Sequence, residues 1–102
     1  MNISEWQKEV HRLAVEKGWY IVDRTFPELI ALLHSEVSEA FDAYRNLKDI
    51  KEELANIALR LLDTCEYWGV NLEAEMIKSI TTIRRDHIDM GIKCISFIIF
   101  SH

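Results

Sequence analysis

Apolar side chains recur every three or four positions along most of the chain, the spacing that places them on one face of an α-helix. Stretches of this kind predict helices at about residues 4–17, 26–45, 50–68 and 72–85. Only 3 Gly and 1 Pro interrupt the chain, which favours long helices over a many-turned β-sandwich. The expected fold is therefore all-α, an antiparallel bundle of four to five helices completed by oligomerisation.

Capping signals mark the expected ends of these helices. Ser4 is followed three residues later by glutamine, which makes a capping box and predicts Ser4 as the N-cap of the first helix. Thr25 begins a second capping box with proline in the first turn, and Asn71 is the expected cap of the fourth helix. Gly18 and Gly69 are the expected stops of the first and third helices.

The end of the chain has a different character. Residues 92–100 are β-branched and aromatic and lack the polar face of an amphipathic helix. A strand, a buried apolar extension and an interface segment all fit this composition. Residues 86–102 are thus an atypical tail on a single expected domain, residues 1–102. Because so short a helical unit buries only a modest core, we expect it to oligomerise.

Charge and hydropathy narrow the class of protein. A net charge of -5 argues against electrostatic binding of a nucleic-acid polymer. No apolar run approaches the ~18 residues of a membrane-spanning helix, and the N-terminus lacks the features of a signal peptide. Cys65 and Cys94 show no metal-ligand or redox spacing, so reduced thiols are expected. The expectation is a cytoplasmic protein without a membrane partner.

Two of the predicted helices carry oxygen-bearing side chains in pairs. Glu36 and Glu39 form an E-x-x-E pair, and Glu53 and Asn56 form a matching pair on the next helix. Residues three apart share a helix face. The short turn near Leu47 makes the two helices antiparallel neighbours, so at ~1.5 Å per residue the two pairs overlap within roughly 3 Å along the axis. All four side chains can therefore face each other.

Several carboxylates packed together repel one another unless a cation neutralises them. Oxygen ligands select Mg²⁺, or Mn²⁺, over Zn²⁺, and such an ion would carry a polyphosphate and lower the pKa of an attacking water. The alternative is a solvated helix face whose acidic residues pair with nearby basic residues such as Lys48 and Lys51. The place of Glu36 and Glu39 beside the apolar stripe, rather than opposite it, favours the metal site.

Residues 31–40 and 52–63 together resemble the MazG-like all-α nucleoside triphosphate pyrophosphohydrolases, whose motif is E-x-x-E, a variable spacer and E-x-x-D. The resemblance covers roughly residues 3–85. It implies a helical bundle that assembles as a dimer or tetramer. It also implies Mg²⁺-dependent hydrolysis of a ribo- or deoxyribonucleoside triphosphate between its α- and β-phosphates, giving a nucleoside monophosphate and pyrophosphate. The role implied is clearance of non-standard or surplus nucleotides.

Carried over to this chain, Glu36, Glu39 and Glu53 match the metal-binding and catalytic carboxylates of the family. The chain departs from the motif at Asn56, which stands where the family has aspartate. An asparagine amide oxygen can bind a metal but brings no negative charge. A catalytically weakened or inactive nucleotide-binding or regulatory module of the same fold is therefore an alternative, and a plain helical interaction protein is a second one.

Further substrate contacts are implied outside the carboxylates. Lys78 and Arg85 match basic residues of the family's last helix that contact phosphates, although Thr82 stands where asparagine is usual. Trp19, in the connector before the second predicted helix, is the best candidate for stacking on a base. The alternative role of such an aromatic side chain, and the more common one, is packing in a core or an interface. No partner for His11 can be identified from the sequence.

Overall fold

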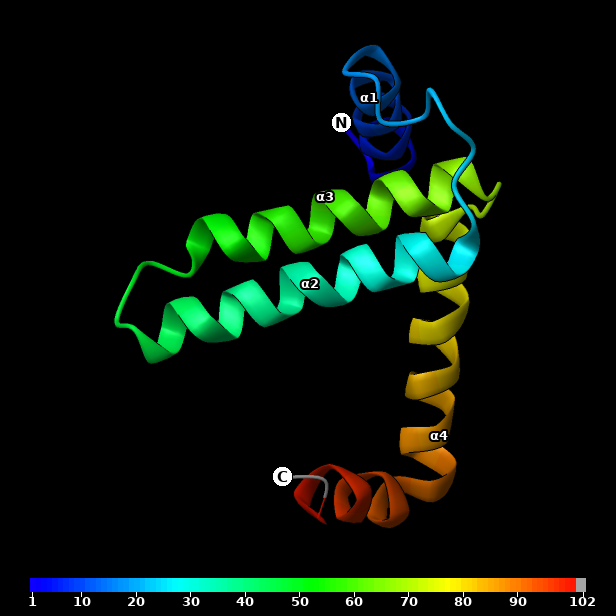
Figure 1. The fold of residues 1–102 in the computed structure, drawn as a ribbon. Coiled ribbons are helices and arrows are strands. Elements are labelled where there is room, and N and C mark those ends of the chain that lie inside the picture. Colours follow the sequence, from blue (N-terminus) through cyan, green and yellow to red (C-terminus); the bar gives the residue numbers. More distant parts are fainter. Residues whose placement is uncertain (101–102) are drawn as a thin grey trace. The chain divides into compact units, whose positions relative to one another are not determined.

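The computed structural model describes the backbone of residues 1–100 and the side chains of residues 1–86, and every regular element in that part is a helix. This confirms the all-α class predicted from the hydrophobic spacing. The helices are α1 (Ile3–Glu16), α2 (Phe26–Arg45), α3 (Lys51–Tyr67) and α4 (Leu72–Phe100) (Figure 1). No helix within the described residues combines the length and the hydrophobicity needed to cross a lipid bilayer.

The first helix begins earlier than predicted, with Asn2 rather than Ser4 as its N-cap. Asn2 Oδ1 accepts a hydrogen bond from the Glu5 backbone N–H at 2.8 Å, and the Glu5 carboxylate accepts one from the Asn2 backbone N–H at 3.3 Å. These two bonds form the capping box. The prediction of Ser4 was wrong because Gln7, its expected partner, is buried and bonded to residues far along the chain.

The boundaries of α2 and α3 agree with the prediction to within a residue or so. Thr25 caps α2, and its Oγ1 accepts a hydrogen bond from the Glu28 backbone N–H at 3.3 Å. Gly18 and Gly69 follow the ends of α1 and α3 with φ angles of 85° and 68°, in a region that glycine occupies without steric cost.

The fourth helix extends further than the predicted end near residue 85. It continues to Phe100, so a strand in this tail is wrong. β-Branched and aromatic residues lower helix propensity by only tenths of a kcal/mol each, and a helix already nucleated extends cooperatively. The side chains of the tail, including Cys94, lie outside the described residues.

The chain divides into two compact units, residues 1–72 and 73–102. The first unit holds α1, α2 and α3, and the second holds the rest of α4 and is described by itself. The single domain expected from the sequence stays a prediction.

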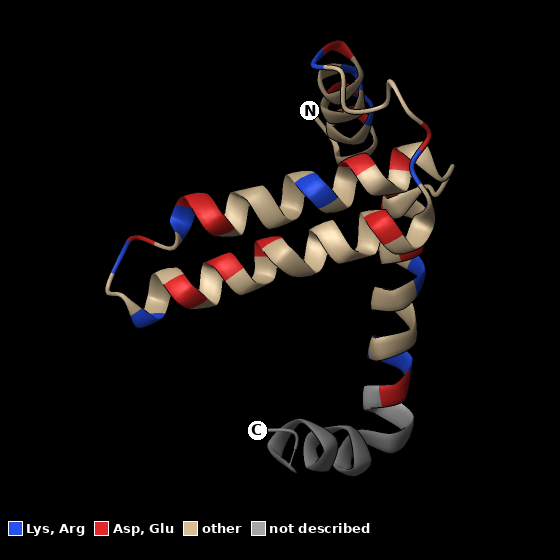
Figure 2. Cartoon of the chain, viewed as in Figure 1, with Lys and Arg blue, Asp and Glu red and all other residues tan. Residues whose placement is uncertain are grey.

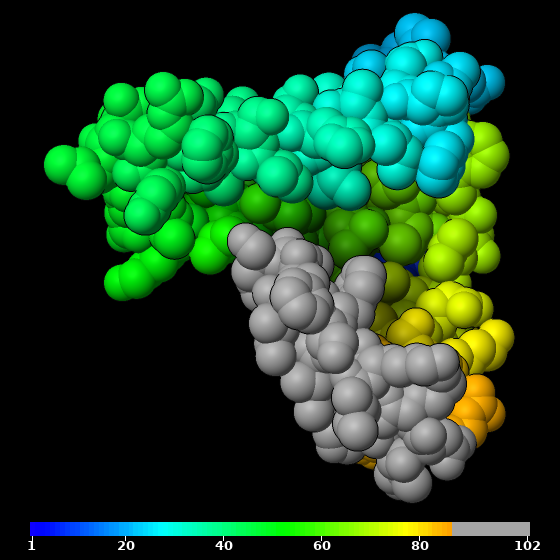
Figure 3. All heavy atoms as spheres, turned by 90° about the horizontal axis from the view of Figure 1, so that it is seen from below, coloured from blue at the N-terminus to red at the C-terminus, as the bar shows by residue number. Residues whose placement is uncertain are grey.

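Helix α3 is the central element of the first unit, because it packs against both α1 and α2. Helices α2 and α3 run in opposite directions, as the short turn predicted (Figure 1). Their side chains meet along the pair in the space-filling view (Figure 3). Leu29 and Ala43 of α2 and Cys65 of α3 are buried. Cys65 is a free thiol, and burial raises its pKa.

Candidate metal centre

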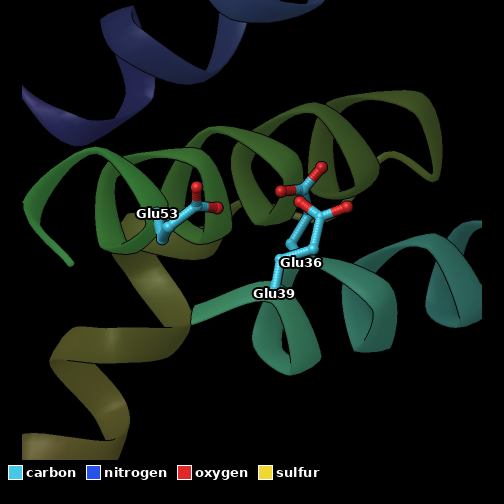
Figure 4. Close-up of side chains that lie close together, drawn as sticks. All are labelled: Glu36, Glu39 and Glu53. Carbon is cyan, nitrogen blue, oxygen red and sulfur yellow. The ribbon is translucent and has the colours of Figure 1, made fainter. Parts of the chain in front are cut away.

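Three of the predicted carboxylates meet between α2 and α3. Glu36 and Glu39 project from α2 toward α3, and Glu53 stands in the first turn of α3 (Figure 4). One oxygen from each of the three lies within 4.8 Å of the other two. Oxygens on opposite sides of one Mg²⁺ are roughly 4.2 Å apart, so a small inward movement would let the carboxylates share a cation.

Two of these carboxylates are incompletely bonded. Oε2 of Glu36 and Oε2 of Glu53 are buried and have no hydrogen-bond partner. A buried charged oxygen without a donor or a cation is costly. The Glu39 side chain, in contrast, is exposed and leaves the cluster open to solvent. The donor set and its unsatisfied oxygens therefore fit a hard divalent cation that enters from solvent.

The electrostatics of the cluster agree with this fit. Burial raises the pKa of Glu36 above its ordinary value, and the neighbouring Glu39 carboxylate raises it further. The guanidinium of Arg60 acts in the opposite direction, but the raised pKa shows that it does not compensate fully. The protein alone thus disfavours ionisation of Glu36, and a divalent cation would favour it.

A cavity of about 370 Å³ adjoins the cluster. Its polar lining comes from several elements of the first unit: Lys17, Trp19, Glu36, Asn56, Arg60 and Asp63. Apolar side chains of α1, among them Leu13, complete the wall. A mostly apolar cavity with a few polar groups is the usual form of a small-molecule site, and this volume lies within the usual range. Asn56 is half-buried and lines the cavity. Its predicted role as a fourth metal ligand stays a prediction.

Arg60 was not identified from the sequence, although it lies one turn after Asn56 on the same face of α3. Figure 2 shows a basic position among the acidic ones on this helix. The Arg60 guanidinium carbon lies 3.7 Å from the centroid of the Trp19 ring. Its Nη2 is 3.8 Å from Oε1 of Glu36, which links α3 to the carboxylates of α2. Trp19 lines the cavity, and its ring is in contact with Arg60. Its predicted stacking on a base stays a prediction.

Asp63 joins α3 to α1 and to the connector. His11 Nδ1 is 2.7 Å from Asp63 Oδ1, and the Tyr20 hydroxyl donates to Asp63 Oδ2 at 2.6 Å. Tyr20 also stacks on Tyr67 at 4.3 Å between ring centroids. Burial and the hydrogen bond to Asp63 both raise the pKa of Tyr20. This network supplies the partner of His11 and anchors the connector that carries Trp19.

The predicted phosphate-binding residues lie on α4, in the second unit. Lys78 is exposed and pairs with Glu75 of the same helix at 3.3 Å. Arg85 is exposed. Because this unit is described by itself, a contact of either residue with a phosphate stays a prediction.

No protein-family model, curated protein or solved structure matches this chain. The resemblance to the MazG-like family therefore rests on the two motifs and stays a hypothesis.

Proposed function

We propose that this protein is a Mg²⁺-dependent nucleoside triphosphate pyrophosphohydrolase of the MazG-like type. The observation that carries the proposal is that Glu36, Glu39 and Glu53 meet in one cluster. Within it, one carboxylate oxygen of Glu36 and one of Glu53 are buried and have no hydrogen-bond donor. Solvated surface carboxylates would not be expected to bury unsatisfied oxygens. The adjoining cavity supplies space for part of a nucleotide.

The three glutamates would hold the cation, and Asn56 would add a neutral amide oxygen. Mn²⁺ is a possible substitute for Mg²⁺, because both prefer oxygen ligands. When bound, the cation neutralises phosphate charge and lowers the pKa of the attacking water. A carboxylate oxygen of the cluster accepts a proton from this water, and the water oxygen bonds to the α-phosphorus. The bond between that phosphorus and the bridging oxygen breaks, and pyrophosphate leaves.

The cavity would receive the nucleoside. Its apolar wall and the Trp19 ring suit a base, which gains about 1–3 kcal/mol by stacking on an aromatic side chain. Lys78 and Arg85 would neutralise the outer phosphates, as the family resemblance implies. The product pair of a nucleoside monophosphate and pyrophosphate fits a role in clearing non-standard or surplus nucleotides.

A homodimer or homotetramer belongs to the same proposal. The α2–α3 pair exposes several large apolar side chains of the first unit. Val37, Phe41 and Leu54 are 49%, 59% and 53% exposed. Contiguous exposed apolar surface is typical of an interface. A second copy that covers this surface would complete an antiparallel bundle.

Asn56 supports a second candidate, a weakened or inactive nucleotide-binding module of the same fold. With one negative charge fewer than E-x-x-D, the site would bind its cation less tightly. Such a protein would bind a triphosphate with Mg²⁺ and release no pyrophosphate.

The decisive experiment measures pyrophosphate release from a panel of ribo- and deoxyribonucleoside triphosphates with Mg²⁺ or Mn²⁺. Wild type is compared with Glu39→Gln and with Glu52→Gln, a matched control at an exposed position of α3 outside the cluster. Metal-dependent release that only Glu39→Gln abolishes supports the enzyme. Metal-dependent binding without release supports the second candidate. Neither binding nor release by the folded protein would refute both.

A further inference from the structure

Arg60 is a buried cation with few protein partners. Its side chain is 10% exposed, it lines the cavity, and it stacks on Trp19. Its Nε is buried without a hydrogen-bond partner. Its nearest anion is Glu36, at 3.8 Å, which is well beyond the ~2.7–2.9 Å of a charge-assisted hydrogen bond.

An exposed arginine of the same unit is bonded far better. Arg12 of α1 donates to Glu9 at 2.7 and 3.0 Å and to Glu16 at 3.0 Å. Burial makes an unsatisfied guanidinium more costly, so the weaker bonding of Arg60 is the reverse of what a purely structural arginine would show. Arg60 lines the cavity, where an anionic ligand could accept hydrogen bonds from its guanidinium.

The chemistry of that ligand follows from the fork of the guanidinium. Planar, parallel N–H donors match the oxygens of a phosphate group. The group next to Arg60 is Glu36, a proposed metal ligand, so the anion that reaches Arg60 would be one carried by the cation. A cation at Glu36 would also repel Arg60 and weaken the present ion pair.

We propose that Arg60 is a phosphate-binding residue that pairs with Glu36 only until the cation and the triphosphate arrive. This inference rests on the proposed function. In the metal-free protein Arg60 partly neutralises Glu36 and competes with a cation for it. In the complex it turns to a phosphate oxygen while remaining against Trp19. Arg60 therefore weakens the binding of a cation alone and strengthens the binding of the cation–triphosphate complex.

The test exploits these opposite signs. Arg60→Met keeps an unbranched stem that can cover part of the Trp19 ring but removes the guanidinium and its charge. Titration calorimetry measures the Kd of Mn²⁺ alone and then the Kd of an α,β-methylene nucleoside triphosphate in saturating Mg²⁺. Arg60→Met should bind Mn²⁺ roughly threefold tighter. It should bind the triphosphate analogue about tenfold more weakly. Arg12→Met, the exposed control, should change neither constant.

Further variants separate the possible failures. Glu53→Gln should abolish Mn²⁺ binding; if wild type binds no Mn²⁺, the proposed metal centre itself fails. The role of Arg60 is refuted, and the metal centre stands, if wild type binds Mn²⁺ but not the triphosphate analogue. The same conclusion holds if Arg60→Met shifts both Kd values in the same direction or shifts neither. Arg60→Lys keeps the charge and decides the matter should Arg60→Met fail to fold. Arg60→Lys should leave Mn²⁺ binding unchanged and weaken binding of the triphosphate analogue severalfold, because lysine lacks the forked donors of the guanidinium. Unchanged binding of the analogue would contradict the proposal.

Discussion

Asp63 and Glu36 line the same cavity, yet the protein surrounds their carboxylates in opposite ways. Asp63 is 2% exposed, and His11 and Tyr20 each make a short hydrogen bond to one of its oxygens. Glu36 is also largely buried, but its Oε2 has no donor and its nearest cation, on Arg60, is 3.8 Å away. Burial alone therefore does not mark a functional carboxylate. The number of donors around each oxygen separates a carboxylate that is complete within the protein from one suited to a ligand.

The largest expected effect is on catalysis, at the unsatisfied carboxylates. Glu53→Gln should lower pyrophosphate release at least about a hundredfold, because the loss of one charged ligand removes several kcal/mol of metal-dependent stabilisation. The free energy of unfolding in EDTA should change little or rise, since the variant relieves repulsion. Both are measured beside Glu52→Gln, the exposed neighbour. Equal losses in the two variants would mean that the cluster has no special role.

The reverse pattern is expected at Asp63. Asp63→Ala leaves His11 and Tyr20 without their shared acceptor and should lower the free energy of unfolding by about 3 kcal/mol. Urea denaturation measures this change. Mn²⁺ affinity of the folded fraction should stay close to that of wild type. If Asp63→Ala keeps its stability and loses Mn²⁺ binding, Asp63 is a metal ligand. It would then not differ from Glu36 in function.

A smaller effect is expected from restoring the charge at the fourth position. Asn56→Asp should bind Mn²⁺ about tenfold tighter, or ~1.4 kcal/mol, because cation affinity grows with the number of charged ligands. The same change should destabilise the metal-free protein by adding a negative charge to the cluster. Calorimetry and denaturation in EDTA measure the two effects. Unchanged affinity would show that residue 56 does not reach the cation.

The smallest effect sharpens the electrostatic side of the comparison. The pKa of Glu36 is raised in the folded protein, so its contribution to stability is present below the ordinary carboxyl pKa and is lost as the pH rises through the raised value. The free energy of unfolding of the metal-free protein should therefore fall as the pH rises from the ordinary carboxyl pKa through the raised pKa of Glu36. Glu36→Gln should remove the loss and be modestly more stable than wild type at neutral pH in EDTA.

Saturating Mg²⁺ should also remove this loss in wild type, because the cation favours the ionised carboxylate. Urea titrations across the pH range, with and without Mg²⁺, measure both effects. A Glu36→Gln variant that is less stable than wild type at neutral pH would mean that the pairing with Arg60 outweighs burial and repulsion.

Local spacing in the sequence determined the helices and much of the candidate site. Hydrophobic periodicity predicted α1 to α3, and the Thr25 cap and the two glycine stops placed their boundaries. The short turn between α2 and α3 predicted an antiparallel pair, and with it the meeting of Glu36, Glu39 and Glu53. These inferences succeed because each depends on residues three or four apart, or on two helices joined by a tight turn.

Only the tertiary structure decided the contacts between residues far apart in the chain. The hydrogen bonds of Asp63 to His11 and Tyr20 span 52 and 43 residues, and the stacking of Arg60 on Trp19 likewise joins α3 to the connector. These contacts depend on how α1 and the connector pack against α3, which no local spacing encodes. The cap of α1 failed for the same reason, because the burial of Gln7 withdrew it from the capping box predicted around Ser4. The spacing of residues in the sequence thus determined which carboxylates meet. Tertiary packing decided which carboxylate receives hydrogen bonds on both oxygens and which has an oxygen without a donor.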